Sequence, residues 1–143
     1  MTTTDLKKQA RNVNWLIDQF VDNTVGVEQA FAVSSDGLLM AVSSSIERSY
    51  ADRMAAVVSG VRSLADGAAR LTGRAQFTQV IMEFPGAYLF ISVVSGGSTL
   101  GVLSRSDADL GLVGYEIAML VERVGNELTP ELIAELRNTL SAS

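Results

Sequence analysis

Three short apolar segments joined by two tight turns constrain the fold of this chain more than any other feature of its sequence. The segments QFTQVIMEF, AYLFISVVS and STLGVLSRS follow one another over residues 76–106. Pro85-Gly86 separates the first two and Gly96-Gly97 separates the last two, and both dipeptides are typical of turns. Strands with such short connections pair as antiparallel neighbours. The middle segment is apolar on both faces, so we predict that it lies inside a sheet.

A second pair of strands is predicted on either side of Ser34-Ser35-Asp36-Gly37. Phe31 and Val33 alternate with alanines before this stretch, and the apolar run LLMAVSS follows it. Asp tolerates a left-handed backbone and Gly adopts positive φ freely, which makes Asp-Gly suitable for a tight reversal. The chain is therefore expected to form five antiparallel strands, and this first hairpin carries no group suited to chemistry.

The N-terminal segment 4–21 is predicted to be a helix, because its apolar residues recur at spacings of three and four. Trp15 lies off that apolar stripe. We expect a neighbour to cover its side chain, and an exposed binding anchor is the alternative.

Three further helices are predicted. A long one begins with Ser49 as its N-cap and runs to about Leu71, where Gly73 ends it. Another begins near Asp107, and Thr129-Pro130 begins a short final helix.

The order of these elements predicts an α+β fold, with one domain spanning residues 1–143. Its core covers about residues 6–105, and a helical extension follows over 107–143. We expect a five-stranded antiparallel sheet with the long central helix on one face and the N- and C-terminal helices on the other. A chain of 143 residues can bury such a core without a metal ion or a disulfide.

The long helix carries two neighbouring stripes of different size. Glycine inside a helix costs about 0.5–1 kcal/mol relative to alanine, so two glycines on one face need an explanation. Close approach of another element is one explanation, and a tolerated surface weakness is the other. The pattern is explained if the stripe of large residues packs on the chain's own sheet and the stripe of small residues packs against a second copy. The sequence does not fix which stripe faces the sheet. The large stripe is Met54, Val57, Val61, Leu64, Ala68 and Leu71; the small stripe, our predicted dimer interface, is Ala56, Gly60, Ser63 and Gly67.

The composition excludes several classes of chemistry. The chain has no His and no Cys, which removes the usual zinc sites, thiol nucleophiles and Ser-His pairs. The only lysines are Lys7 and Lys8, and neither a phosphate loop nor a dinucleotide-binding glycine motif occurs; SGGS at 95–98 is a turn. We therefore predict no catalytic residue, no cofactor and no metal.

Charge and hydropathy limit the classes of partner that the chain could bind and the cellular location that we expect for it. A net charge of −5 argues against non-specific nucleic-acid binding. No apolar run reaches the length of a membrane span and the first residues lack a signal peptide's apolar region, so we expect a cytoplasmic protein without membrane insertion. Five arginines and two acids lie between positions 48 and 74, whereas seven acids and one base lie between 107 and 135. This asymmetry could steer a partner or mark two solvated helix faces.

The stretch VGVEQAFAVSSDGLLMAVSS resembles the first hairpin of the roadblock/dynein light chain family, in which an Asp-Gly turn joins two short strands after an N-terminal helix. The resemblance continues through the small-residue-rich helix and through FTQVIMEFPGAYLFISVVSGGSTLGVL, and it covers roughly residues 6–105. ADLGLVGYEIAMLVERVGNELTPELI is similar to the C-terminal part of actinobacterial conservon roadblock proteins. The layer architecture also resembles that of profilin.

The resemblance implies a non-catalytic adaptor. Roadblock proteins form homodimers by pairing sheet edges and juxtaposing their central helices, and the bacterial members are associated with small Ras-like GTPases. For conservon systems the resemblance also implies a membrane sensor-kinase-like protein as a partner. On this basis, we predict that a GTPase binds around the central helix at Tyr50, Arg53, Arg62 and Arg70.

Two other functions stay open. A PAS- or GAF-like sensory domain would bind a small ligand in a cavity beneath the sheet, with a few convergent polar groups. A purely structural dimeric scaffold would not respond to a nucleotide. The side chains expected to face inward are aliphatic and are predicted to fill their own core: Leu89, Ile91, Val93, Leu100 and Val102.

Overall fold

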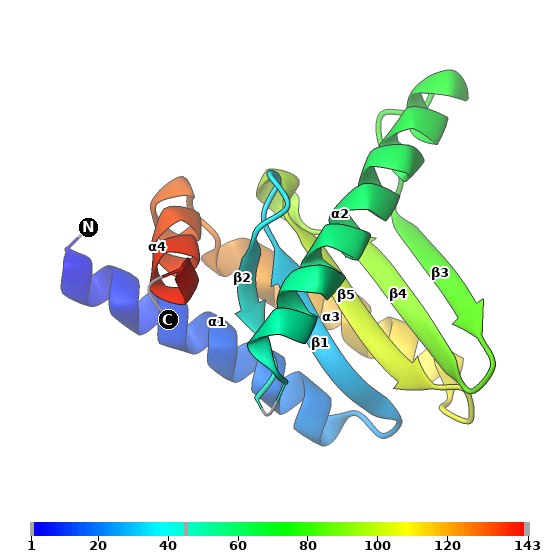
Figure 1. Ribbon diagram of the computed structural model, residues 1–143, viewed down its shortest axis with the longest axis horizontal. Coiled ribbons are helices and arrows are strands. Elements are labelled where there is room, and N and C mark those ends of the chain that lie inside the picture. The colour runs from blue at the N-terminus through cyan, green and yellow to red at the C-terminus, as the bar shows by residue number, and fades with distance from the viewer. Residues whose placement is uncertain (1, 45, 142–143) are drawn as a thin grey trace.

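The computed structural model describes residues 2–44 and 46–141, which form helices packed on both faces of one sheet (Figure 1). A 3-10 turn, η1 (Ser95–Gly97), joins the last two strands. In chain order the other elements are α1 (Thr3–Asn23), β1 (Val27–Val33), β2 (Leu39–Val42), α2 (Arg48–Leu71), β3 (Gln79–Phe84), β4 (Ala87–Val93), β5 (Thr99–Arg105), α3 (Leu110–Glu127) and α4 (Pro130–Ser141).

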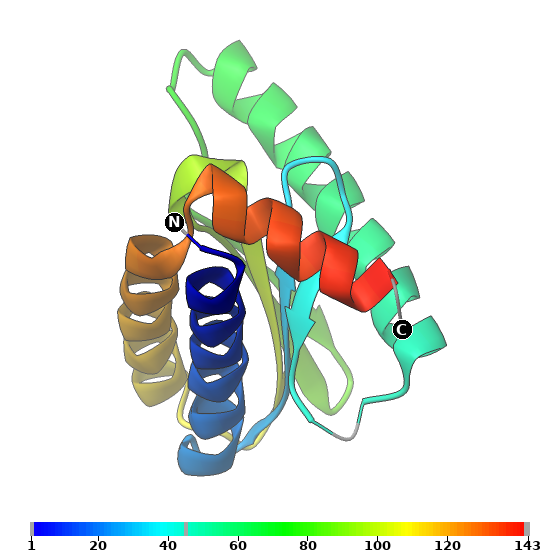
Figure 2. The same cartoon turned by 90° about the vertical axis from the view of Figure 1, so that its left-hand side faces the viewer.

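The five strands form an antiparallel sheet in the order β2-β1-β5-β4-β3. Helix α2 crosses one face of this sheet, and α1 and α3 lie side by side on the other (Figures 1 and 2). The predicted α+β fold is therefore confirmed. Pairing of β1 with β5 places the first hairpin beside the last three strands, and it leaves β2 and β3 as the two outermost strands.

Two of the predicted turns depend on glycine. Gly37 and Gly86 have φ angles of 85° and 86°, a left-handed backbone that side chains disfavour. The Ser34 N–H donates to the Leu38 carbonyl at 2.9 Å and closes the first hairpin. Because these turn residues set the reversals locally, both hairpins could be predicted from the sequence.

Apolar side chains fill both sides of the sheet. Leu100 and Val102 pack in the larger core between the sheet and helices α1, α3 and α4. Leu89 and Ile91 pack in the smaller core beneath α2. All four are at most 2% exposed, and Val93 is half-buried, so the aliphatic residues do fill the interior as predicted.

Helix α2 turns small residues, rather than large ones, toward the sheet. A Cβ atom added at Gly101 of β5 would lie 2.9 Å from Cγ2 of Val58, which shows how closely the helix approaches the strand. Large side chains do not fit in so narrow a space, and most of the residues that face the sheet are alanines. The buried residues of α2 are Ala51, Ala55, Val58 and Ala69.

The expected packing of the large stripe on the sheet is therefore only partly correct. Met54 and Val61 are half-buried against the smaller core. Val57, Leu64 and Leu71 are 45%, 78% and 91% exposed, and for them the expectation is wrong.

Carboxylates set the starts of two helices at positions that differ from the prediction. Helix α2 begins at Arg48, because the Glu47 side chain, not Ser49, accepts hydrogen bonds from the first turn at 3.0 Å. Helix α3 begins at Leu110, where the Asp109 carboxylate caps the first turn. Thr129 caps α4 as predicted and accepts from the Leu132 N–H at 3.0 Å.

Candidate interaction surface

The outward side of α2 exposes the predicted small stripe. Ala56, Gly60 and Ser63 are exposed and Gly67 is half-exposed. A Cβ added at Gly60 would meet nothing within 4 Å, and one at Gly67 would meet only the end of the Arg70 side chain at 3.9 Å. Packing within the chain therefore does not require either glycine, which leaves both explanations given for them from the sequence: contact with another molecule and a tolerated surface weakness.

Three large apolar residues flank this stripe. Val57, Leu64 and Leu71 share an arc of roughly 120° with the small residues, at 100° of rotation per residue. The C-terminal half of α2 extends beyond the sheet, so Leu64 and Leu71 have no layer of the same chain above them (Figure 1). Large exposed apolar side chains gathered on one helix face are typical of an interaction site. We call these residues the α2 outer face: Ala56, Val57, Gly60, Ser63, Leu64, Gly67 and Leu71.

Strand β3, next to α2, presents an open edge. It pairs with β4 on one side only, so the backbone groups of its other side have no strand partner. Ile81 and Phe84 are 50% and 42% exposed. An exposed edge with apolar side chains can pair with another strand.

Two of the four residues predicted to bind a partner are engaged within the chain. The Tyr50 hydroxyl donates to Gln29 Oε1 at 2.7 Å. Arg62 donates through Nη1 to the carbonyls of Gly97 and Ser98 at 2.6 and 2.8 Å, and through Nε to Asp66 at 3.4 Å. The Arg62 side chain is 17% exposed and ties α2 to the turn before β5. The sequence offered no signal for the contacts of Arg62 with Gly97 and Ser98, because these acceptors are backbone carbonyls far away in the chain.

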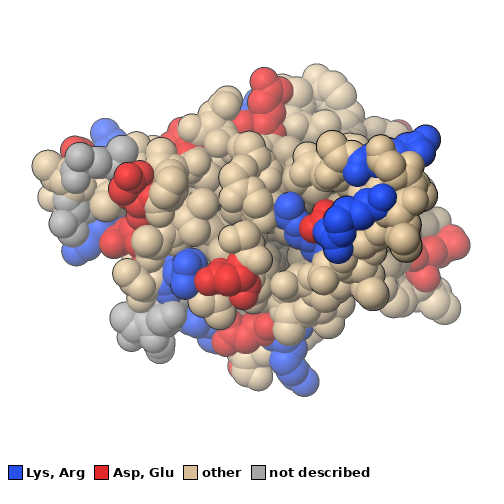
Figure 3. All heavy atoms as spheres, turned by 90° about the horizontal axis from the view of Figure 1, so that it is seen from above, with Lys and Arg blue, Asp and Glu red and all other residues tan. Residues whose placement is uncertain are grey.

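The other two arginines point to solvent. Arg53 and Arg70 are exposed, and Arg53 lies on the same arc as the α2 outer face. Basic side chains gather toward the end of the molecule where α2 finishes, around one acidic group (Figure 3). This end of the protein is suited to an acidic partner.

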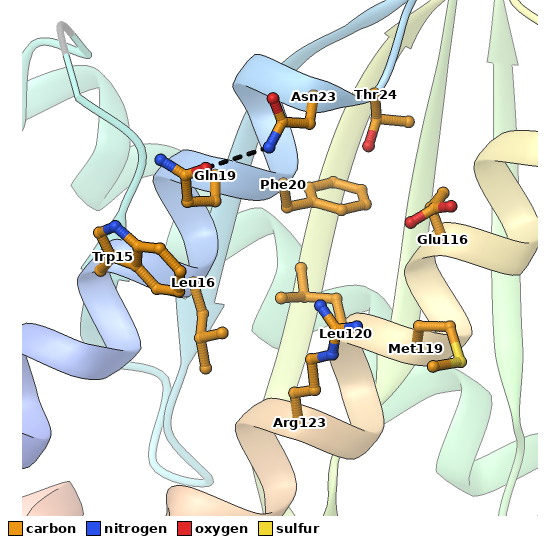
Figure 4. Close-up of a pocket in the computed structure, with 10 residues that line it drawn as sticks. All are labelled: Trp15, Leu16, Gln19, Phe20, Asn23, Thr24, Glu116, Met119, Leu120 and Arg123. Carbon is orange, nitrogen blue, oxygen red and sulfur yellow. Dashed lines mark hydrogen bonds between the residues drawn. The ribbon is translucent and has the colours of Figure 1, made fainter.

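A groove of about 200 Å³ lies between α1 and α3, on the face opposite α2. Trp15, Phe20 and Met119 contribute apolar walls, and Arg123 points toward its centre (Figure 4). Trp15 is 60% exposed, so the expectation that a neighbour covers it is wrong: α1 rests on the sheet through Val13 and Ile17, which turns the indole outward.

Among the described residues, no three His, Cys, Asp or Glu side chains lie close enough to hold a metal ion. A hydrogen bond from Ser34 lowers the pKa of Asp36, burial opposes this effect, and the Arg137 charge lowers the pKa further.

Of the helices in residues 2–44 and 46–141, none is long and apolar enough to cross a bilayer.

Comparisons with known proteins agree with this geometry. The family model of the roadblock/LC7 domain matches residues 13–104. A crystal structure of a roadblock/LC7 domain from Streptomyces avermitilis is 36% identical, with a TM-score of 0.73, and the match covers 78% of this chain and 92% of that one. A search of curated proteins found no significant match.

Two more distant structures share the fold. Myxococcus xanthus MglB has a TM-score of 0.76 at 20% identity, with 82% of this chain and 87% of that one covered. Profilin IA of Acanthamoeba castellanii has a TM-score of 0.56 at 16% identity, with 80% and 97% covered, which accords with the expected profilin-like layers. The family model and the Streptomyces structure together show that this chain belongs to the roadblock/LC7 family.

Proposed function

We propose that this chain is a non-catalytic adaptor that forms a homodimer and binds a small Ras-like GTPase in a bacterial signalling complex. The observation that carries the proposal is the α2 outer face, an apolar helix surface with two glycines that the chain's own packing does not need. Membership of the roadblock/LC7 family supports it at the level of the family.

The open edge of β3 and the α2 outer face support one geometry for the dimer. Pairing β3 with β3 of a second copy continues the sheet across a two-fold axis, so that both copies use the same surface. The two α2 helices then lie side by side, and Ala56, Gly60, Ser63 and Gly67 allow their backbones to approach. Covering Leu64 and Leu71 contributes about 1.5–3 kcal/mol for each fully buried side chain.

The exposed arginines support a place for the GTPase. Arg70 lies just outside the arc of the α2 outer face and Arg53 precedes its first residue, Ala56, so both can contact acidic groups on a partner seated across the paired helices. We assign Tyr50 and Arg62 a positioning role, because each holds α2 to the sheet or to a turn. A GTPase whose switch loops differ between GDP and GTP states would bind this surface with two affinities, and the adaptor would favour the better-bound state.

In conservon-like systems we further propose that the dimer meets a membrane sensor-kinase-like protein. The α1–α3 groove lies on the face opposite α2, so a second protein could bind there while a GTPase occupies the other face.

The sensory alternative has weaker support than the adaptor. A pocket of about 340 Å³ does lie between the β3–β4 end of the sheet and α3, but no charged side chain lines it. The rest of the sheet interior is filled by side chains such as Leu100 and Val102. A purely structural scaffold would share the dimer but would bind a GTPase equally in both nucleotide states, or not at all.

The decisive experiment measures binding of the full chain to a small Ras-like GTPase from the same organism. The GTPase is loaded with GDP or with a non-hydrolysable GTP analogue, and affinity is measured by calorimetry. We expect binding at least about tenfold tighter in one state, which corresponds to about 1.4 kcal/mol. Equal affinities leave only the scaffold, and no binding in either state rejects the GTPase adaptor.

A further inference from the structure

We propose that helix α4 masks a second self-association edge at β2, so that the chain forms closed dimers instead of open-ended assemblies. The partner excluded by the mask is another copy of this chain, pairing β2 with β2. The inference rests on the proposed dimer in one respect: it takes β3 as the edge that two copies share.

The two outermost strands of the sheet differ sharply in exposure. On β3, Ile81 and Phe84 are 50% and 42% exposed. On β2, which is just as peripheral in the strand order, Met40 and Ala41 are 1% and 0% exposed. An edge strand is not buried by its own sheet, so another element must cover it.

The outward backbone of β2 can be located from its pairing with β1. The Ser43 N–H donates to the Ala30 carbonyl at 3.0 Å, and Ala41 pairs with Ala32 two residues further along. Hydrogen-bonding direction alternates along an antiparallel strand, so the backbone N–H of Val42, between Ala41 and Ser43, points away from β1. The register shifts at Met40, so the regular edge of β2 begins at Ala41. The outward N–H of Val42 is a group that a β2 strand from another copy would need.

Helix α4 provides the cover. Leu132 and Leu136 are 0% and 1% exposed and pack in the same core cluster as Met40 and Ala41. Figure 2, which looks at the sheet from the β2 side, shows α4 lying across this strand between α1 and α2. The family model ends at residue 104, before α4, so this cover lies outside the matched domain.

An ion pair fixes α4 over the hairpin. Arg137 Nη2 lies 3.0 Å from Asp36 Oδ2, at the tip of the turn between β1 and β2. Both side chains are partly exposed, so the pair adds little stability by itself. The two buried leucines hold the helix in place, and the ion pair adds one contact between α4 and the hairpin turn.

The arrangement of edges explains why a mask matters. A chain with one self-complementary edge stops at two copies, because pairing consumes that edge. A chain with two such edges keeps one free after every pairing and grows without limit. Covering β2 while leaving β3 open therefore selects the closed dimer, which is one of the ways proteins prevent edge-to-edge aggregation.

The test displaces α4 in the full chain with Leu136→Asp and follows molar mass by light scattering over a wide range of concentrations. We expect a folded protein whose mass rises beyond that of the wild type as concentration increases. Adding Val42→Pro should return the mass to the wild-type value, since proline removes an outward N–H and is tolerated at such an edge position.

Two results overturn the inference. One is a folded Leu136→Asp protein whose mass equals that of the wild type at every concentration. The other is growth that Val42→Pro does not reverse, which would indicate association through exposed core rather than through the β2 edge.

A milder variant covers the case in which Leu136→Asp does not fold. Leu136→Ala removes most of the buried side chain that holds α4, without placing a charge in the core. We expect amide hydrogens at residues 39–42 to exchange at least about tenfold faster in this variant, and those of β3 at 79–84 to change less. Exchange at residues 39–42 that is unchanged, or that rises equally across the sheet, overturns the inference.

The same data separate this inference from the proposed dimer. If the wild type is monomeric, pairing through β3 is rejected. Concentration-dependent growth of Leu136→Asp that Val42→Pro abolishes would still support the mask. If the wild type is dimeric and Leu136→Asp stays dimeric, the dimer stands and the mask is rejected.

Discussion

Val58 of α2 packs directly against the backbone of Gly101 in β5, and a Cβ at Gly101 would lie 2.9 Å from the Val58 Cγ2 atom. This contact sets the distance between the helix and the sheet. Because the space is narrow, α2 buries alanines and turns Leu64 and Leu71 outward. The interaction surface is therefore a consequence of how closely the helix packs on its own sheet.

The first prediction concerns that contact. Gly101→Ala should destabilise the protein by about 1–3 kcal/mol, because the added methyl group overpacks a tight site. Gly114→Ala is the matched control, since a Cβ at Gly114 of α3 meets nothing within 4 Å and alanine favours a helix by about 0.5–1 kcal/mol. Denaturant unfolding measures both. A Gly101→Ala protein as stable as the wild type would contradict the close packing.

The second prediction concerns the outer face of the same helix. Gly60→Leu should convert the dimer to a monomer, because a leucine there separates the two α2 backbones. The protomer itself should fold normally, since Gly60 has open space around it. Gly114→Leu places the same side chain at an open helix position on the opposite face and should leave the dimer intact. Sedimentation velocity distinguishes the outcomes, and equal behaviour of the two variants would count against the α2 contact.

The strands, the turns and the periodicity of the helices could be predicted from the sequence, because each depends on residues that are close together in the chain. Asp36-Gly37 and Pro85-Gly86 mark reversals through their own backbone preferences. The glycines of α2 also led to a predicted interface, because their cost to a helix calls for a compensating contact; that interface stays a prediction.

Which face of α2 packs on the sheet could not be predicted from the sequence, because it depends on Gly101, a residue of a strand far away in the chain. Arg62 is a second case: a surface arginine and one that binds the carbonyls of Gly97 and Ser98 look alike in a sequence. The cover of β2 by α4 is a third, since the periodicity of a short helix does not say where it docks. Each of these features is a contact between distant segments.

The third prediction compares Arg62, which binds backbone carbonyls of its own chain, with Arg53, which is exposed. Arg62→Ala should lower the free energy of unfolding by about 1–3 kcal/mol, because the Gly97 and Ser98 carbonyls lose a charged donor. Arg53→Glu should leave stability within about 0.5 kcal/mol of the wild type, as an exposed substitution. It should instead weaken GTPase binding, with a smaller dependence on salt. Arg53→Glu with unchanged GTPase affinity would remove this residue from the partner surface.

The fourth prediction concerns pH. The Ser34 hydrogen bond and the Arg137 charge lower the pKa of Asp36 in the folded state, so this carboxylate stabilises the hairpin above its unfolded pKa. That contribution should be constant between about pH 5 and 8 and should be lost as the pH falls through the lowered folded value. Titration followed by carbon NMR measures the pKa directly, and Ser34→Ala should raise it. An Asp36 pKa at or above the ordinary Asp value would contradict the hydrogen-bonded turn.

The most direct test of the account is the molar mass of the unmodified chain, measured by light scattering during size-exclusion chromatography. If the α2 outer face packs against the same face of a second copy, the molar mass should be twice the 15.2 kDa of a single chain. This mass should not change on dilution through the working range of concentrations. A mass of 15.2 kDa at every concentration would mean that Leu64, Leu71 and the β3 edge face water, and the adaptor dimer would be rejected.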